Sequence, residues 1–130
     1  MNWKLILSLS LFGLVMAFAT VSLISSAVEP FCWLVIFCIC AYLIAKKAPG
    51  MFLFHGFLVS MVNSVWITAV HVLFFDAYMA HHPEMAAMSG PFQPSRVTML
   101  VSGPIFGALF GIVLGLFAFV AAKLFRKPAA

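Results

Sequence analysis

The sequence predicts an all-α integral membrane protein, a bundle of four transmembrane helices with both termini in the cytoplasm. Apolar residues make up 65% of the 130 residues and charged residues only 8%, whereas about a quarter of the residues in soluble domains are charged. A soluble domain of this length leaves much of its surface in water and cannot hide so many apolar side chains. Helix-breaking residues divide the apolar sequence into four runs, and the basic residues gather on one side of the resulting topology.

The first span is predicted over 5–26. Its apolar run follows Lys4 and ends in the small residues of 25–27, and its length suits a helix that crosses the hydrocarbon core with about 17–25 residues. The same features resemble a signal peptide with a small-residue cleavage site. Because the apolar run exceeds the about 7–15 residues of a signal core, we expect the segment to remain as a span.

The second span, 31–47, is the shortest of the four. Pro30 precedes it, and proline is well tolerated in the first turn of a helix. The span crosses the membrane only if Lys46 and Lys47 extend their side chains towards the headgroups. Three cysteines with no partner elsewhere exclude a disulfide framework and favour a packing role. These cysteines are Cys32, Cys38 and Cys40.

The third span, predicted over 51–78, carries most of the polar residues of the apolar runs. At about 100° per residue, its small and polar side chains fall on one arc of the helix, opposite an apolar face. Polar side chains inside a bilayer turn towards protein or water rather than lipid. Hydrogen bonds between helices explain this arc, and a path for a solute or proton is the alternative. The candidate path residues are Ser60, Asn63, Ser64, Thr68 and His71.

The fourth span, 97–122, has the most specific pattern in the sequence. Glycines recur at every fourth position and therefore line one face of the helix. They are Gly103, Gly107, Gly111 and Gly115. Overlapping GxxxG units favour close helix packing in lipid, where no hydrophobic drive brings helices together. Two partners are open: packing within the chain against Gly13 and Ala17 of the first span, or a seam between copies in a homo-oligomer.

Charge predicts the orientation of the four spans. Six of the seven basic residues fall on the side of the N-terminus, as the positive-inside rule expects of the cytoplasmic side. They are Lys4, Lys46, Lys47, Lys123, Arg126 and Lys127. The opposite side holds Arg96 and the three acids Glu29, Asp76 and Glu84. Basic residues spread over helix ends bind lipid headgroups rather than nucleic acid. Size and hydropathy resemble those of small four-span bacterial proteins, which indicates a multi-pass protein of the bacterial inner (plasma) membrane.

Histidines and acids raise two alternatives that involve a cofactor. Residue types that bind zinc or a similar divalent ion cluster after the third span, without an established metal-site spacing. They are His71, Asp76, His81, His82 and Glu84. A b-type haem held by two helices needs a histidine from each, but His55 and His71 share one helix, about 24 Å apart. Haem binding would therefore require two copies of the chain.

No motif of a familiar catalytic type is present, and we expect no enzymatic activity. The sequence lacks a nucleotide-binding glycine loop, HExxH, CxxC and GxSxG. The leading hypothesis is a non-enzymatic oligomeric membrane component or accessory subunit without a cofactor. It would assemble through the Gly103–Gly115 face with copies of itself or with other membrane subunits. The alternatives are a small channel or facilitator along the polar arc of the third span, and a haem- or metal-binding membrane protein.

Overall fold

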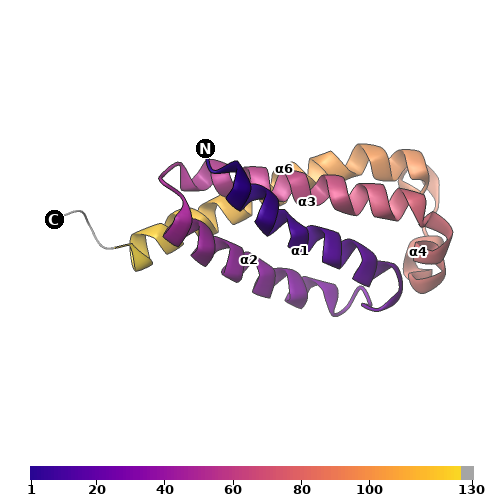
Figure 1. The fold of residues 1–130 in the computed structure, drawn as a ribbon. Coiled ribbons are helices and arrows are strands. Elements are labelled where there is room, and N and C mark those ends of the chain that lie inside the picture. Colours follow the sequence, from indigo (N-terminus) through magenta and orange to yellow (C-terminus); the bar gives the residue numbers. More distant parts are fainter. Residues whose placement is uncertain (127–130) are drawn as a thin grey trace.

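The computed structural model describes residues 1–126, apart from the side chain of Phe92, and shows an all-helical protein (Figure 1). Its four long helices are α1 (Trp3–Ser22), α2 (Glu29–Lys47), α3 (Phe52–Leu73) and α6 (Arg96–Phe125). Each of the four is long and apolar enough to span a membrane. The predicted all-α class and the four long apolar helices are thus confirmed. Lys127, which the charge pattern predicts on the inner side, lies outside the described residues.

Local sequence signals set the ends of these helices. The Asn2 side chain accepts a hydrogen bond from the Leu5 amide at 3.1 Å, which satisfies one of the free N–H groups of the first turn. Ser95 and Thr98 form a capping box at the start of α6. Between α2 and α3 the chain reverses at Met51, whose φ of 51° is left-handed. Because this connection is short, the consecutive helices α2 and α3 run in opposite directions (Figure 1).

The third predicted span, 51–78, extends beyond the C-terminal end of the corresponding helix. Helix α3 ends at Leu73, and the chain continues as the separate helix α4 (Phe75–His81), the single turn α5 (Pro83–Ala86) and the 3₁₀ turn η1 (Gly90–Phe92). The break turns α4 towards the end of α1, where Tyr78 becomes buried with 9% of its surface exposed. The burial of this ring depends on residues from other parts of the chain, so the local sequence pattern could not predict it.

Helix α3 lies at the centre of the packing. It contacts α6 most extensively and α1 on its other side, and α2 packs against α6. Helices α1 and α2 make few contacts with each other although they are consecutive in the sequence. The start of α1 and the end of α6 lie at one end of the bundle, here called the terminal end, and α4 lies at the opposite end, here called the α4 end (Figure 1).

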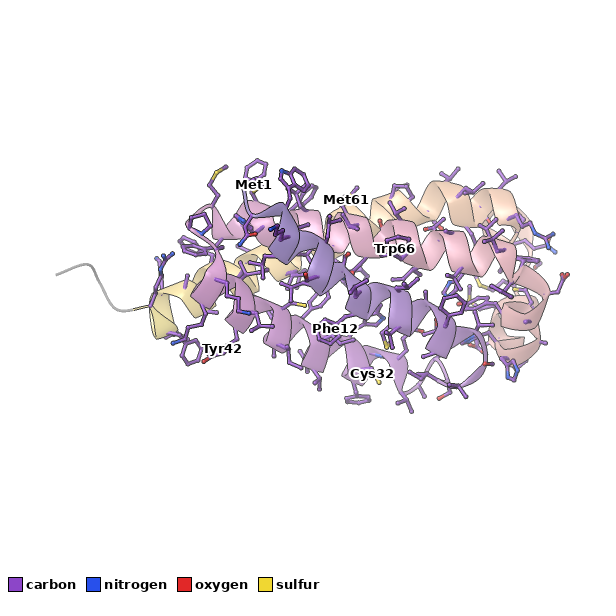
Figure 2. All side chains as sticks on the ribbon, in the orientation of Figure 1. Met1, Phe12, Cys32, Tyr42, Met61 and Trp66 are labelled. Atoms are coloured by element: carbon purple, nitrogen blue, oxygen red, sulfur yellow. The ribbon has the colours of Figure 1, made fainter. Side chains whose placement is uncertain are left out.

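The buried core lies in the terminal half of the bundle. Ile6, Ile44, Val59 and Leu114, one from each long helix, are all 0% exposed there. Large apolar side chains on the outside of the bundle point away from it (Figure 2), and Val15, for example, is 66% exposed. An apolar exterior of this extent suits a lipid environment and is unusual for a monomeric protein in water.

Candidate binding cavity

The glycine face of α6 lies against α3 of the same chain. A Cβ atom built on Gly115 would lie 2.6 Å from the carbonyl oxygen of Leu53, and one built on Gly56 would lie 2.6 Å from Gly115 Cα. These distances leave no room for a side chain at either position, so the two backbones meet directly. The remaining glycines meet α3 side chains in the same way: Gly103 faces Thr68, Gly107 faces Ser64 and Gly111 faces Phe57.

The expected pairing of this face with the first span is wrong. Gly13 of α1 faces Asn63 of α3, because a Cβ built on Gly13 would lie 2.8 Å from Asn63 Cβ. Ala17 is 0% exposed and belongs to the same small apolar cluster as Val70 of α3. The small residues of α1 and α6 do not meet, because each helix presents them to α3. Since α3 already covers the α6 glycines, this face is not free for a second copy in the folded chain.

The α4 half of the bundle contains a partly open cavity of about 630 Å³. It lies between α2 on one side and the packed pair α3 and α6 on the other, because α2 contacts α6 but makes few contacts with α3. Its polar wall comes from α3 and brings together all five residues of the predicted path. These are Ser60, Asn63, Ser64, Thr68 and His71.

The other walls of the cavity are mainly aromatic. Trp33 and Phe37 contribute from α2, and three rings contribute from α6. The Phe37 ring meets those of Phe110 and Phe117 edge to face, with centroids 6.3 Å apart in both pairs. We did not predict this wall from the sequence. The four-residue spacings of Trp33 to Phe37 and of Phe106 to Phe110 were a usable signal, because such pairs share one helix face.

The cavity closes towards the terminal end. Its deepest lining residues are Phe37, Ser60 and Phe117. The core begins directly beyond them, where Val59 and Leu114 are 0% exposed. Within the described residues the cavity therefore ends blind about halfway along the bundle, and the polar path does not continue as an open pore.

Asn63 is the exceptional side chain of the polar wall. It is 3% exposed, and neither its amide nitrogen nor its amide oxygen has a hydrogen-bond partner among the described residues. Its neighbours are satisfied, since the Ser60 hydroxyl donates to the Gly107 carbonyl at 2.9 Å and the Ser64 hydroxyl to the Met61 carbonyl at 2.7 Å. A buried polar group without a partner costs about 1–3 kcal/mol. Its amide oxygen is the atom nearest to a Cβ built on Gly13, so the amide faces α1 in this conformation and reaches the cavity by rotation of the side chain.

His71 lies at the α4 end of the polar wall and is held by two neighbours. The Thr20 hydroxyl donates to the Met16 carbonyl at 2.8 Å, so Thr20 Oγ1 accepts a hydrogen bond from His71 Nε2–H, also at 2.8 Å. The Tyr78 ring of α4 lies over the His71 ring with centroids 4.3 Å apart. On its other face, Tyr78 stacks on the His82 ring at 4.2 Å. The α4 segment thus closes over the end of the cavity through a stack of three rings.

A hydrogen-bonded group, here called the His82 latch, ties the α4–α5 segment to the end of α1. The buried His82 ring donates from Nε2–H to the Thr20 carbonyl at 2.7 Å, and its Nδ1 lies 2.8 Å from Ser26 Oγ and 3.2 Å from Glu84 Oε1. The Ser26 hydroxyl donates to the Glu84 carboxylate. His82, Ser26 and Glu84 are thus joined to the last turn of α1.

Negative charge collects at the α4 end of the cavity. Glu29 lines the cavity, and its carboxylate accepts a hydrogen bond from Trp33 Nε1 at 3.2 Å. Burial, together with the negative charges of Glu29 and Glu84, raises the pKa of Tyr78 to about 12. The hydrogen bond from Ser26 lowers the pKa of Glu84 below its ordinary value. None of the described side chains that line the cavity is a lysine or arginine.

The structure separates the predicted metal ligands into two groups. His71, His82 and Glu84 lie near one another around Tyr78, whereas Asp76 pairs with Arg96 at 3.7 Å and His81 is exposed. Over residues 1–126, no three His, Cys, Asp or Glu side chains form a group that could hold a metal ion. Metal binding therefore stays a prediction, and the positions of these residues add no support for it.

His55 is used for packing at the terminal end. It is 1% exposed, and its Nε2 accepts a hydrogen bond from the Asn2 amide at 3.1 Å. Nδ1 therefore carries the proton and donates to the Met51 carbonyl at 3.0 Å. To bind a haem iron through Nε2, His55 would have to give up the hydrogen bond from Asn2, whereas the bond from Nδ1–H to Met51 could remain. Haem binding also remains a prediction.

Comparison with known proteins identifies no relative: no family model, no curated protein and no solved structure matches this chain. The functional interpretation therefore rests on the geometry of the cavity.

Proposed function

We propose that this chain is a non-enzymatic, multi-pass membrane protein that binds a small amphipathic molecule in the cavity between α2, α3 and α6. The observation that carries the proposal is the buried, unpartnered amide of Asn63 on the polar wall. A ligand with a polar head would satisfy this amide once the Asn63 side chain turns from Gly13 of α1 into the cavity, while its apolar body packed on the aromatic walls. The volume of about 630 Å³ lies within the range of about 300–1,000 Å³ that is common for small-molecule sites.

We further propose that the terminal end faces the cytoplasm of a plasma membrane and that the cavity belongs to the outer half. Support comes from the basic residues at the terminal end, since Lys4, Lys46, Lys47, Lys123 and Arg126 all belong to helix ends there. The positive-inside rule associates such residues with the cytoplasmic side. Accessibility of single cysteines to a membrane-impermeant reagent tests the orientation, with Lys47→Cys and Ser95→Cys expected on opposite sides.

A facilitator that moves its ligand across the membrane is a second candidate. All five residues of the predicted polar path line the cavity, which favours this function over a purely structural one. Because the cavity ends blind, transport would need a second conformation in which the core around Val59 and Leu114 opens. Assembly through the Gly103–Gly115 face receives less support, since α3 packs on these glycines. An accessory subunit would have to use another surface.

Fluorescence of Trp33 tests ligand binding directly, because this indole lines the cavity. The Trp3→Phe/Trp66→Phe variant leaves Trp33 as the single tryptophan. In nanodiscs of neutral lipid, 4-bromobenzamide is expected to quench Trp33 in a saturable manner, since its amide can pair with Asn63 and its bromine quenches a nearby indole.

Two further variants separate binding in the cavity from uptake into lipid. Ser102→Phe places a ring in the cavity and should abolish the saturable quenching, because Ser102 is a lining residue. Ser8→Phe adds the same ring at an exposed position of α1 and should leave the quenching unchanged. Linear quenching that is the same in both variants would refute the proposed function.

A further inference from the structure

We propose that the cavity selects lipophilic organic cations, with a quaternary or protonated nitrogen held between Glu29 and the aromatic walls. This inference rests on the proposed function and names the class of ligand for the same site. It follows from the charge of the cavity wall and from the rings that face it.

The charge of the lining is one-sided. Glu29 lines the cavity, and its one side-chain hydrogen bond among the described residues comes from Trp33. No lysine, arginine or histidine of the described chain lies within 4.0 Å of this carboxylate, whereas Asp76 has Arg96 and Glu84 has His82. Glu29 is thus the one acid of the described residues without a cationic partner in the chain. A half-buried carboxylate beside aromatic walls attracts an opposite charge, because the effective dielectric there is lower than in bulk water.

The aromatic rings add a second preference for positive charge. Ring faces carry negative electrostatic potential and attract ammonium groups. Elsewhere in the chain, aromatic faces already have cations: Lys46 lies over Tyr42 at 5.7 Å, Arg96 over Phe75 at 5.0 Å, Lys123 over Phe119 at 4.6 Å and Arg126 over Phe52 at 5.1 Å. None of the rings that line the cavity is among them. The cavity therefore combines aromatic faces and a carboxylate that the described chain leaves without a cation.

The neighbouring Tyr78 adds no positive charge that would offset the carboxylate of Glu29. Burial, with a smaller contribution from the negative charges of Glu29 and Glu84, raises the pKa of Tyr78 at the α4 end of the cavity to about 12. Its phenol is neutral at ordinary pH and adds no charge to the lining, and its two ring faces are covered by His71 and His82. An anionic ligand would meet repulsion from Glu29, with no lysine or arginine among the described lining residues to offset it. A neutral ligand would gain only the apolar contacts and the hydrogen bond to Asn63.

A matched pair of ligands isolates the charge. (4-Bromophenyl)trimethylammonium and 1-bromo-4-tert-butylbenzene have nearly the same shape and differ in having nitrogen or carbon at the centre of the bulky group. Quenching of Trp33 in the single-tryptophan variant, in nanodiscs of neutral lipid, reports the binding of both. We expect the cation to bind at least about tenfold more tightly, a difference of about 1.4 kcal/mol.

Charge variants assign the preference to Glu29. Glu29→Gln should weaken binding of the ammonium compound about tenfold and leave that of the neutral compound unchanged. Asp76→Asn is the matched control, because Asp76 pairs with Arg96 outside the cavity, and it should change neither. Equal affinities for the two compounds, or a cation preference that survives Glu29→Gln, would overturn the inference.

The outcome is distinguishable from failure of the proposed function. If 4-bromobenzamide still binds saturably and Ser102→Phe blocks it, the cavity is a binding site whose selectivity we have misassigned. If phospholipid brominated on its acyl chains quenches Trp33 fully and none of the small compounds competes, lipid occupies the cavity, and both the inference and the proposed function fail.

Discussion

The Asn63 side chain of α3 occupies the space that a side chain at Gly13 of α1 would fill, since a Cβ built on Gly13 would lie 2.8 Å from Asn63 Cβ. A glycine on one helix thus allows a polar residue of another to stay on the wall of the cavity. This contact links the packing of α1 to the chemistry of the candidate site.

Gly13→Ala tests this contact. The added methyl group would push against Asn63, and overpacking of a close contact costs about 1–3 kcal/mol. We expect a lower free energy of unfolding, measured by denaturation in detergent, together with weaker binding of 4-bromobenzamide. Gly50→Ala is the control, because nothing lies within 4 Å of a Cβ at Gly50. Equal stability of the two variants would show that Asn63 is not held by this contact.

Asn63→Leu should separate stability from binding. Leucine has a similar volume and removes the buried amide that has no partner, so the free energy of unfolding should stay the same or rise by about 1–3 kcal/mol. Quenching by 4-bromobenzamide should weaken, because its polar head loses its partner. Ser60→Ala provides the contrast, since it removes a satisfied hydrogen bond to Gly107 and should lower stability by about 0.6–1.7 kcal/mol. A marked loss of stability in Asn63→Leu would contradict the interpretation.

Gly115→Leu tests whether the glycine face serves packing within the chain or assembly between chains. A side chain here would collide with the Leu53 carbonyl of α3. We therefore expect the free energy of unfolding of the monomer to fall by more than about 3 kcal/mol. Thermal unfolding and size-exclusion chromatography with light scattering measure the two effects. A variant that keeps wild-type stability but loses an oligomer would instead support the seam between copies.

The His82 latch should open as the pH falls. The pKa of Glu84 is lowered in the folded protein, chiefly by the Ser26 hydroxyl, so the folded state favours the carboxylate. The stabilisation is present above the ordinary pKa of a glutamate and is lost as the pH falls through the lowered value. The protection of residues 75–86 from hydrogen exchange, relative to the intrinsic exchange rate at each pH, should therefore decrease below about pH 4.

Two variants assign this pH dependence. Glu84→Gln should remove it, because the amide does not titrate. Asp76→Asn lies on the same segment but outside the latch and should retain it. If the protection of residues 75–86 from exchange is independent of pH in the unmodified protein, Glu84 has no role in holding this segment.

The sequence by itself determined the four long helices, because apolar runs and capping residues act locally. Helical periodicity also determined that Ser60, Asn63, Ser64, Thr68 and His71 share one face and that the α6 glycines share another. These are properties of a single helix, and a single helix can be read from its own residues.

Only the tertiary structure decided what each face meets. The α6 glycines pack on α3 rather than on Gly13 and Ala17, because side chains of α3 fill the space beside the glycines of both neighbours, as Asn63 does at Gly13 and Thr68 at Gly103. The cavity exists because α2 diverges from α3, which no local pattern records. The end of α3 at Leu73 follows from the burial of Tyr78 between His71 and His82. These outcomes depend on the fit between residues far apart in the chain, and that fit is set by the relative positions of the helices.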